Sequence, residues 1–207
     1  MYTFQSKYIA VEGAIGAGKT SLVLQLSKKY DARAFLEVVE ENPFLPRFYE
    51  DIKSYAFRTQ IFFLLSRYDQ QVKAAQQDLF KQLSFSDYMF AKDRIFAHLT
   101  LSGNELNMYE HLYQIMSRDI PAPDLIVYLK ASTKLLMKRI VLRDRPFERK
   151  ISIQYMEKLN NSYENYFSDQ KNFTQTRLVT INADELDFVG NAHDLEFICE
   201  QIKQKDR

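Results

Sequence analysis

The sequence lacks the residues and segments from which disulfide frameworks, cysteine metal clusters and membrane anchors are built. It has one cysteine, Cys199, among 207 residues, which excludes an internal disulfide and a cysteine-ligated metal cluster. No apolar run approaches the length of a membrane-spanning helix, and the N-terminus has no signal-peptide pattern. We therefore expect a cytoplasmic protein with no membrane partner.

The chain also lacks an excess of charge of either sign. It has 28 basic and 27 acidic residues and a net charge of +1, so nothing favours binding to a nucleic-acid polymer or a membrane surface. Hydrophobic residues make up 46% of the chain, which is typical of a globular protein. The length and the absence of a linker or repeat predict a single domain over residues 1–207.

A glycine-rich loop near the N-terminus matches the phosphate-binding pattern G-x-x-x-x-G-K-[ST]. It reads Gly13-Ala14-Ile15-Gly16-Ala17-Gly18-Lys19-Thr20. A short apolar segment at 8–11 precedes it and a helical pattern follows it, which argues against an accidental glycine turn. In this context Lys19 reaches the terminal phosphates and the Thr20 hydroxyl binds Mg²⁺. The loop predicts a nucleoside triphosphate site but does not identify the phosphate acceptor.

Short apolar segments alternate with helical patterns along the chain. The predicted strands are 8–11, 34–36, 83–86, 125–129 and 178–181, and the predicted helices are 55–79, 103–118, one opening at 132, 151–170 and 188–205, with a short helix or turn at 46–51. This alternation predicts an α/β fold with a five-stranded parallel sheet flanked by helices. Because ligands bind beyond the carboxyl ends of such strands, we expect Gly13, Glu37 and Asp87 to converge on one crevice.

The long helix at 55–79 has two stripes that compete for the buried side. Apolar residues recur at steps of four and three, and they predict the face that packs on the core. They are Ile61, Leu65, Tyr68, Val72 and Ala75. Gln60, Leu64 and Arg67 form a second stripe, either a pocket wall or an exposed face, and periodicity alone favours the exposed face.

Acidic residues after the second and third strands are candidates for phosphoryl-transfer chemistry. A hydroxyl acceptor needs a carboxylate that takes its proton, and Glu37, Glu40 and Glu41 are available. Position nearest the strand end favours Glu37, although a solvated acidic turn accounts for at least one of the three. Asp87 is a candidate for Mg²⁺ contact, directly or through water.

Three arginines near the end of a predicted helix form the remaining charged pattern. Arg139 and Arg143 lie one helical turn apart, and Arg145 lies just beyond them. They predict a lid, at about 139–150, that closes over the transferring phosphate. A solvated helix end that suits the macrodipole is the alternative, and the presence of a phosphate loop favours the lid.

Taken together, these residues resemble the deoxynucleoside kinases, and most closely the bacterial deoxyguanosine and deoxyadenosine kinase branch. The resemblance covers nearly the whole chain and rests on the phosphate loop, 37–44, Phe48-Tyr49, Gln60, Ser66-Arg67, Asp87, Asp93 and 139–148. It implies a P-loop kinase fold and transfer of the γ-phosphate of ATP to the 5′-hydroxyl of a purine deoxynucleoside in nucleotide salvage. It also implies Mg²⁺ bound with ATP, and a homodimer.

The resemblance implies a role for each matching position. Glu37 is in the place of the base that activates the 5′-hydroxyl, and Asp87 is in the metal-site position. Tyr49 and Glu148 match the pair at the sugar 3′-hydroxyl. Further matches are Gln60, Arg67 and Asp93 for reading the nucleobase, Arg139, Arg143 and Arg145 for the lid, and the loop at 182–185, with Asp184, for the adenine of ATP.

Three positions depart from the family pattern. The family usually has an arginine after the metal-site acid, touching the base carboxylate and the 5′-oxygen, and this chain has Tyr88 at that substrate-site position. A neutral phenol cannot supply the charge, so another arginine would have to. Val38 stands where many members have proline, and Asp144 replaces a glycine between the lid arginines.

The identity of the acceptor stays open at this point. An arginine can meet guanine O6 and N7, and Asp93 can accept from its N1–H and N2–H groups. Adenine can also be satisfied, by Gln60 and Asp93, so we expect a purine with guanine ahead of adenine. The alternatives are a broader deoxynucleoside kinase, a nucleoside monophosphate kinase, for which Arg67 alone is a thin cationic site, and a regulatory P-loop NTPase, for which no switch segments are clear.

Overall fold

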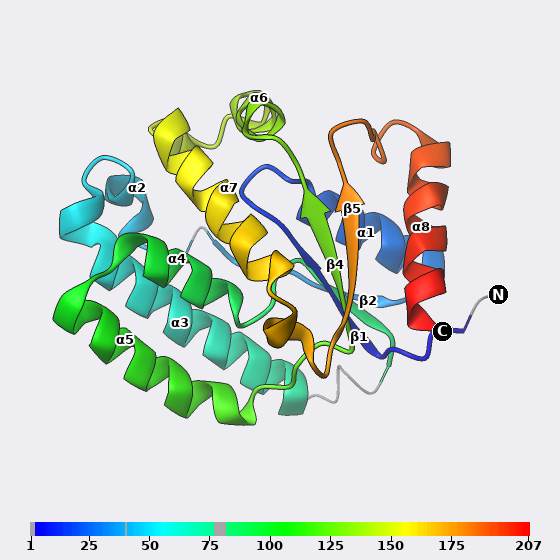
Figure 1. The fold of residues 1–207 in the computed structure, drawn as a ribbon, viewed down its shortest axis with the longest axis horizontal. Helices are drawn as coiled ribbons and strands as arrows, with labels where there is room; N and C mark the ends of the chain where they lie inside the picture. Colours follow the sequence, from blue (N-terminus) through cyan, green and yellow to red (C-terminus); the bar gives the residue numbers. More distant parts are fainter. Residues whose placement is uncertain (1–2, 40, 77–81) are drawn as a thin grey trace.

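A five-stranded parallel sheet lies at the centre of the protein, in a computed structural model that describes residues 3–39, 41–76 and 82–207 (Figure 1). The strands are β1 (Tyr8–Glu12), β2 (Arg33–Phe35), β3 (Ser84–Ser86), β4 (Leu125–Lys130) and β5 (Arg177–Asn182). Their order in the sheet is β2-β3-β1-β4-β5, and every pairing is parallel. The predicted α/β class and the predicted strands are confirmed, within one or two residues at each end.

Helices cover both faces of the sheet, with α1 and α8 to one side and α3, α4, α5 and α7 to the other (Figure 1). Their bounds are α1 (Lys19–Tyr30), α2 (Leu45–Phe48), α3 (Ile52–Gln76), α4 (Lys92–Thr100), α5 (Gly103–Met116), α6 (Thr133–Arg143), α7 (Ile153–Ser168) and α8 (Ala192–Asp206). Short 3-10 turns lie at η2 (Ser117–Asp119), η3 (Pro146–Glu148) and η4 (Gln170–Phe173). In the described ranges, none of the helices has the length and apolar character needed to cross a bilayer.

Capping residues explain where several helices begin. The Ser132 hydroxyl accepts a hydrogen bond from the Leu135 backbone at 3.3 Å, so α6 opens where the sequence predicted. Ser152 caps α7 in the same way, with the Tyr155 backbone at 3.1 Å. The last helix was predicted from 188 but begins four residues later, because the Asn191 side chain caps it. Positions 77–79 of the long predicted helix lie outside the described residues.

Helix α4 was missed by the sequence prediction. Its buried positions include Lys92 and Asp93 beside Ile95 and Ala97. Two charged residues on the buried side of a nine-residue helix leave too little apolar periodicity to recognise.

The most deeply buried stripe of α3 is not the one that periodicity favoured, although Ile61 and Tyr68 of the apolar stripe pack against the core. Gln60, Leu64 and Arg67 are 2%, 0% and 4% exposed, whereas Leu65 in the apolar stripe is 46% exposed. The polar ends of the buried stripe are satisfied by other side chains, Gln60 by Thr100 and Arg67 by two carboxylates. Tertiary hydrogen bonding therefore outweighs the apolar pattern in setting the orientation of this helix.

The two ends of the chain are joined by one buried carboxylate. Asp206, in the last turn of α8, accepts hydrogen bonds from the backbone of Gln5 at 2.7 Å and Ser6 at 2.9 Å. Its side chain is fully buried and also pairs with Arg177 of β5 at 3.4 Å. The carboxylate thus holds the segment that leads into β1 against α8 and β5.

We predict that Asp206→Ala lowers the free energy of unfolding by about 1–3 kcal/mol, because two backbone N–H groups lose their buried acceptor. Urea denaturation followed by circular dichroism measures the change. Glu200→Ala is the matched control, since it removes an exposed ion pair with Lys203 in the same helix and should leave stability unchanged. Equal losses in both variants would contradict the prediction.

Candidate active site

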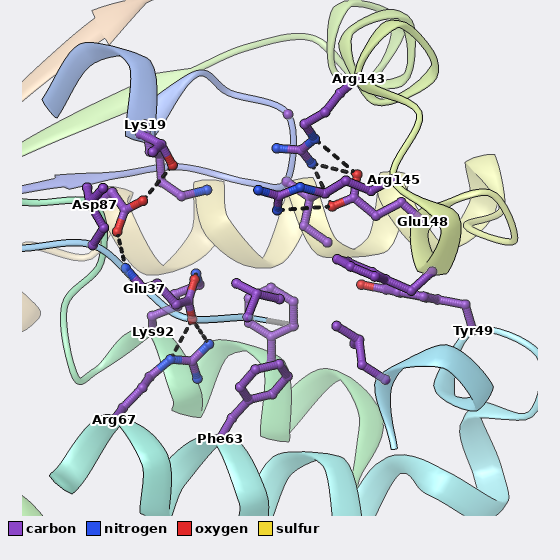
Figure 2. Close-up of a pocket in the computed structure, with 18 of the residues that line it drawn as sticks. Lys19, Glu37, Tyr49, Phe63, Arg67, Asp87, Lys92, Arg143, Arg145 and Glu148 are labelled. Carbon is purple, nitrogen blue, oxygen red and sulfur yellow. Dashed lines mark hydrogen bonds and ion pairs between the residues drawn. The ribbon is translucent and has the colours of Figure 1, made fainter. Parts of the chain in front are cut away.

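A cavity of about 270 Å³ opens at the carboxyl edge of the sheet (Figure 2). Side chains reach it from the phosphate loop, from the segments after β2 and β3, from α2, α3 and α4, and from the segment after α6. Lys19, Glu37 and Asp87 line it together, which is the convergence that the sequence predicted. The phosphate loop, the acidic side chains and the cationic side chains therefore line the same cavity.

The phosphate loop has the backbone shape that its glycines predict. Gly16 and Gly18 have φ angles of 87° and 99°, a region that favours glycine, and α1 begins directly after them at Lys19. A Cβ atom on Gly18 would lie 2.8 Å from the ring of Phe188. The Lys19 ammonium donates to the carbonyl groups of Gly13 and Ala14, at 2.8 and 3.1 Å. Burial, followed by the nearby charge of Lys92, lowers the pKa of Lys19 to about 8.

The Asp87 carboxylate connects the phosphate loop to the segment after β2 (Figure 2). One oxygen accepts from the Thr20 hydroxyl at 2.5 Å and the other from the Glu37 backbone at 2.8 Å. No group of three or more His, Cys, Asp or Glu side chains within the described ranges is arranged to hold a metal. A cation at Thr20 and Asp87 would need further oxygen ligands from a bound ligand or from water.

The Glu37 carboxylate lies between two cations (Figure 2). One oxygen accepts from Arg67 of α3, with Nε at 2.7 Å, and the other accepts from Lys92 of α4 at 2.6 Å. Burial alone would raise the pKa of Glu37, but the charges and hydrogen bonds of Arg67 and Lys92 outweigh it and hold the pKa well below its usual range. The carboxylate is therefore ionised and able to accept a hydrogen bond at neutral pH.

Buried acceptors gather at the α3 and α4 side of the site. Arg67 also pairs with Asp93, whose second oxygen has no hydrogen-bond partner within the described ranges. Burial raises the pKa of Asp93 to about 6 against the opposing charge of Arg67. The amide of Gln60 donates to Thr100 at 3.2 Å, while its oxygen has no partner in the described part of the chain. Gln60 and Arg67 line the cavity. Asp93 does not line it and is connected to it only by its ion pair with Arg67.

The lid arginines do not form one set, which corrects the prediction that all three cover the same point. Arg143 and Arg145 line the cavity and pair with Glu148, at 2.6 and 3.9 Å. Arg139 instead donates to the Ala17 carbonyl at 3.0 Å, against the outer side of the phosphate loop. Helix α6 ends at Asp144, between Arg143 and Arg145. Asp144 adopts the left-handed conformation, with a φ of 49°, and pairs with Arg149.

A second cavity, of about 380 Å³, lies on the other side of the phosphate loop. Arg139, Phe188 and Val189 line it, and Gly16 and Arg143 line both cavities. Asp184, expected at the adenine of ATP, is exposed, accepts from the Ser132 backbone at 2.9 Å and lines neither cavity. The segment 187–189 lines the second cavity, next to the loop at 182–185 for which the contact with adenine was predicted.

Tyr88 is turned away from the cavity, which corrects its prediction as a substrate-site residue. It is fully buried, its hydroxyl donates to Gln70 at 3.0 Å, and its ring lies beside Phe35. Tyr49 and Glu148, in contrast, both line the cavity. Of the other acids considered for the base, Glu41 is exposed and lies outside the cavity, and Glu40 lies outside the described residues.

Two charged residues in or beside the site were not predicted from the sequence. Lys92 lines the cavity, and it was missed because the helix that carries it was missed. Glu12, the last residue of β1, is fully buried and accepts from the backbone of Gly13 and Met89 at 3.1 and 2.8 Å. A single glutamate directly before the glycine loop was the available signal for Glu12.

Comparisons with known proteins agree with this geometry. A family model described as "Deoxynucleoside kinase" matches residues 9–205. The deoxyguanosine kinase of Bacillus subtilis (strain 168) is 40% identical over 95% of this chain and 96% of that protein. The deoxyadenosine kinase of Lactobacillus acidophilus is 32% identical over 96% of each chain. A solved deoxyadenosine kinase from M. mycoides with bound dCTP has a TM-score of 0.80 at 28% identity, covering 95% of this chain and 98% of that one, which confirms the predicted P-loop kinase fold.

We predict that Arg67→Gln raises the pKa of Glu37, because removing a neighbouring positive charge favours the neutral carboxyl. A ¹³C NMR titration of the Glu37 carboxyl, assigned by its absence in Glu37→Gln, measures this. The native signal should stay constant between about pH 3.5 and 7.5, whereas the signal of the variant should titrate within that range. Arg94→Gln, which breaks an exposed pair with Glu110, should leave the Glu37 signal unchanged. A native Glu37 that titrates at its ordinary pKa would contradict the prediction.

Proposed function

The chain belongs to the deoxynucleoside kinase family, and we propose that it transfers the γ-phosphate of ATP to the 5′-hydroxyl of a purine deoxynucleoside, with deoxyguanosine preferred. The observation that carries this proposal is the lining of one cavity by the loop lysine, Lys19, and a paired carboxylate, Glu37. A triphosphate held on the loop and a sugar hydroxyl held at the carboxylate would meet inside that cavity.

In the proposed reaction, Glu37 accepts a hydrogen bond from the 5′-hydroxyl and takes its proton as the oxygen bonds to the γ-phosphorus. The bond from that phosphorus to the leaving oxygen of ADP breaks in the same step. A carboxylate with a low pKa is a weak base, which suits a proton transfer that occurs late in a loose transition state. Lys19, Arg143 and Arg145 would neutralise charge on the transferring group.

We propose one cavity for each substrate. Because Gly16 and Arg143 line both, we propose that the phosphate chain of ATP crosses between them and that its adenine lies in the second cavity, beside Phe188 and Arg139. Tyr49 and Glu148 are proposed to bind the sugar 3′-hydroxyl at the opposite end of the first cavity. Asp184 is not part of this proposal.

Support for a purine comes from the buried acceptors near Arg67. The Asp93 and Gln60 oxygens are acceptors, and Arg67, which also pairs with Glu37 and Asp93, is a donor; donors and acceptors of this kind suit guanine. The 40% identity to a deoxyguanosine kinase supports guanine over adenine. Deoxyadenosine, named for several other relatives, is the second candidate.

We also propose a metal site, a single domain with a lid, and a cellular location. Mg²⁺ is proposed at Thr20 and Asp87, which would hold it, and there it would neutralise negative charge on the phosphates of ATP. The whole chain is proposed to form one domain, with the lid at 139–150. A cytoplasmic location is proposed, because ATP serves as the phosphate donor.

A homodimer is proposed through α3 and α5, which lie side by side (Figure 1). Met108, Leu112 and Ile115 form a stripe on α5 and are 55%, 38% and 63% exposed. Leu65 on α3 is also apolar and is 46% exposed. Contiguous exposed apolar side chains of this kind are typical of association surfaces.

We predict that the protein phosphorylates deoxyguanosine with ATP, and that Glu37→Gln lowers kcat by at least about a hundredfold while ATP still binds. Coupled ADP release measures turnover with deoxyguanosine, deoxyadenosine, deoxycytidine and deoxyguanosine monophosphate as acceptors. No reaction with any of the nucleosides would overturn the proposed function, and reaction with the monophosphate alone would indicate a nucleoside monophosphate kinase. Glu41→Gln, outside the cavity, is the control and should keep full turnover.

We predict that Ile115→Lys converts a dimer into a monomer, because a buried ammonium would disrupt an apolar interface. Sedimentation velocity measures the state. Leu24→Lys, which changes an equally apolar and exposed residue on α1, should leave the dimer intact. A native protein that sediments as a monomer would contradict the proposed assembly.

A further inference from the structure

Lys92 is a buried cation that lines the cavity, and the reaction proposed above gives it no contact with either substrate. We propose that Lys92 is a further catalytic residue, which holds the Glu37 carboxylate and contacts the transferring phosphoryl group. This inference rests on the proposed kinase function.

The position of Lys92 brings it to both reacting groups. Its ammonium lies 2.6 Å from the second oxygen of Glu37, the oxygen that Arg67 does not occupy. It lines the cavity together with Lys19, and its charge contributes to the low pKa of that loop lysine. The phosphoryl group would move from the phosphate loop toward the hydroxyl held at Glu37. Since the Lys92 ammonium influences both Glu37 and the loop lysine, it lies near this path.

The local sequence opposes a lysine at this point, so its presence needs a compensating interaction. Lys92 is the first residue of α4 and is only 5% exposed. A cation at a helix N-terminus faces the positive end of the macrodipole, and burial of an ammonium adds a desolvation cost. Local rules are broken in this way mostly at functional sites.

The neighbouring residues leave the role open to Lys92. Tyr88 is neutral, and its hydroxyl is turned to Gln70. Arg67 is held between Glu37 and Asp93. Within the described ranges, the Lys92 ammonium donates hydrogen bonds to Glu37 alone, so two of its three N–H groups are directed elsewhere.

Lys92 takes part in the proposed phosphoryl transfer without gaining or losing a proton. The 5′-oxygen forms a bond to the γ-phosphorus, the bond to the ADP oxygen breaks, and the hydroxyl proton moves to Glu37. Lys92 stays protonated throughout, donating one hydrogen bond to Glu37 and one to an oxygen of the phosphoryl group. The lysine therefore stabilises negative charge that is shared between donor and acceptor in the transition state.

The test compares Lys92→Met and Lys92→Arg with the native protein, in both the native and the Glu37→Gln backgrounds. We expect Lys92→Met to lower kcat by about 10²–10³, as expected for loss of a transition-state donor, with little change in KM for either substrate. Lys92→Arg should recover most of the activity. In the Glu37→Gln background, Lys92→Met should still lower kcat, because the contact with the phosphoryl group remains to be lost.

Two outcomes would overturn the inference. Full turnover in Lys92→Met would show that the ammonium is dispensable. Loss of turnover in Lys92→Met, but no further loss in the Glu37→Gln background, would show that Lys92 acts only by positioning Glu37. Failure of the proposed function is a separate result, since in that case the native protein would phosphorylate none of the nucleosides.

Matched variants keep the test interpretable. If Lys92→Met alone fails to fold because Glu37 loses a partner, the double variant with Glu37→Gln removes charge from both sides and is compared with Glu37→Gln. Lys130→Met removes an exposed pair with Glu164 and should keep native turnover.

Discussion

The site depends on the burial of one carboxylate, that of Glu37, between Arg67 and Lys92. An ionised carboxylate taken out of water is costly unless charged partners and hydrogen bonds surround it. Here the partners come from two helices, α3 and α4, so the carboxylate fixes the position of both helices relative to the segment after β2. The same cations keep the carboxyl ionised, and they hold its oxygens facing the cavity. Stability and chemistry at this point come from the same set of contacts.

Asp87 extends this constraint to the phosphate loop. Since its two oxygens accept hydrogen bonds from the Thr20 hydroxyl and the Glu37 backbone, a single side chain sets the distance between the loop and the segment that carries Glu37. Glu12 does the same on the other side of the loop, where it joins Gly13 to the backbone of Met89. Two carboxylates thus connect the ends of β1, β2 and β3, which explains why a loop of high intrinsic freedom has one defined shape.

The sequence predicted features that depend on local chemistry and failed where distant contacts decide. The glycine loop, the apolar strands and the Ser132 cap were recognisable because their signals lie within a few residues. Helix α4 was missed and α3 was rotated in the prediction, because their buried sides carry charged and polar residues that are satisfied only by partners far along the chain. Arg139 and Arg143 share a helix face, yet they contact different groups, which spacing alone cannot reveal.

The charges of the cavity lining bear on the catalytic role that we propose for Lys92. Among the described residues that line the cavity, five are cationic and three are acidic, an excess of positive charge that a phosphorylated ligand neutralises. A cation neutralises the charge of such a ligand if its side chain lies in the cavity, whichever element of the sequence carries it. Lys92 brings an ammonium to Glu37 from the start of α4. A tyrosine at position 88, where the family usually has an arginine, therefore does not remove the excess of positive charge. That excess comes from residues of several elements that meet only in the folded cavity.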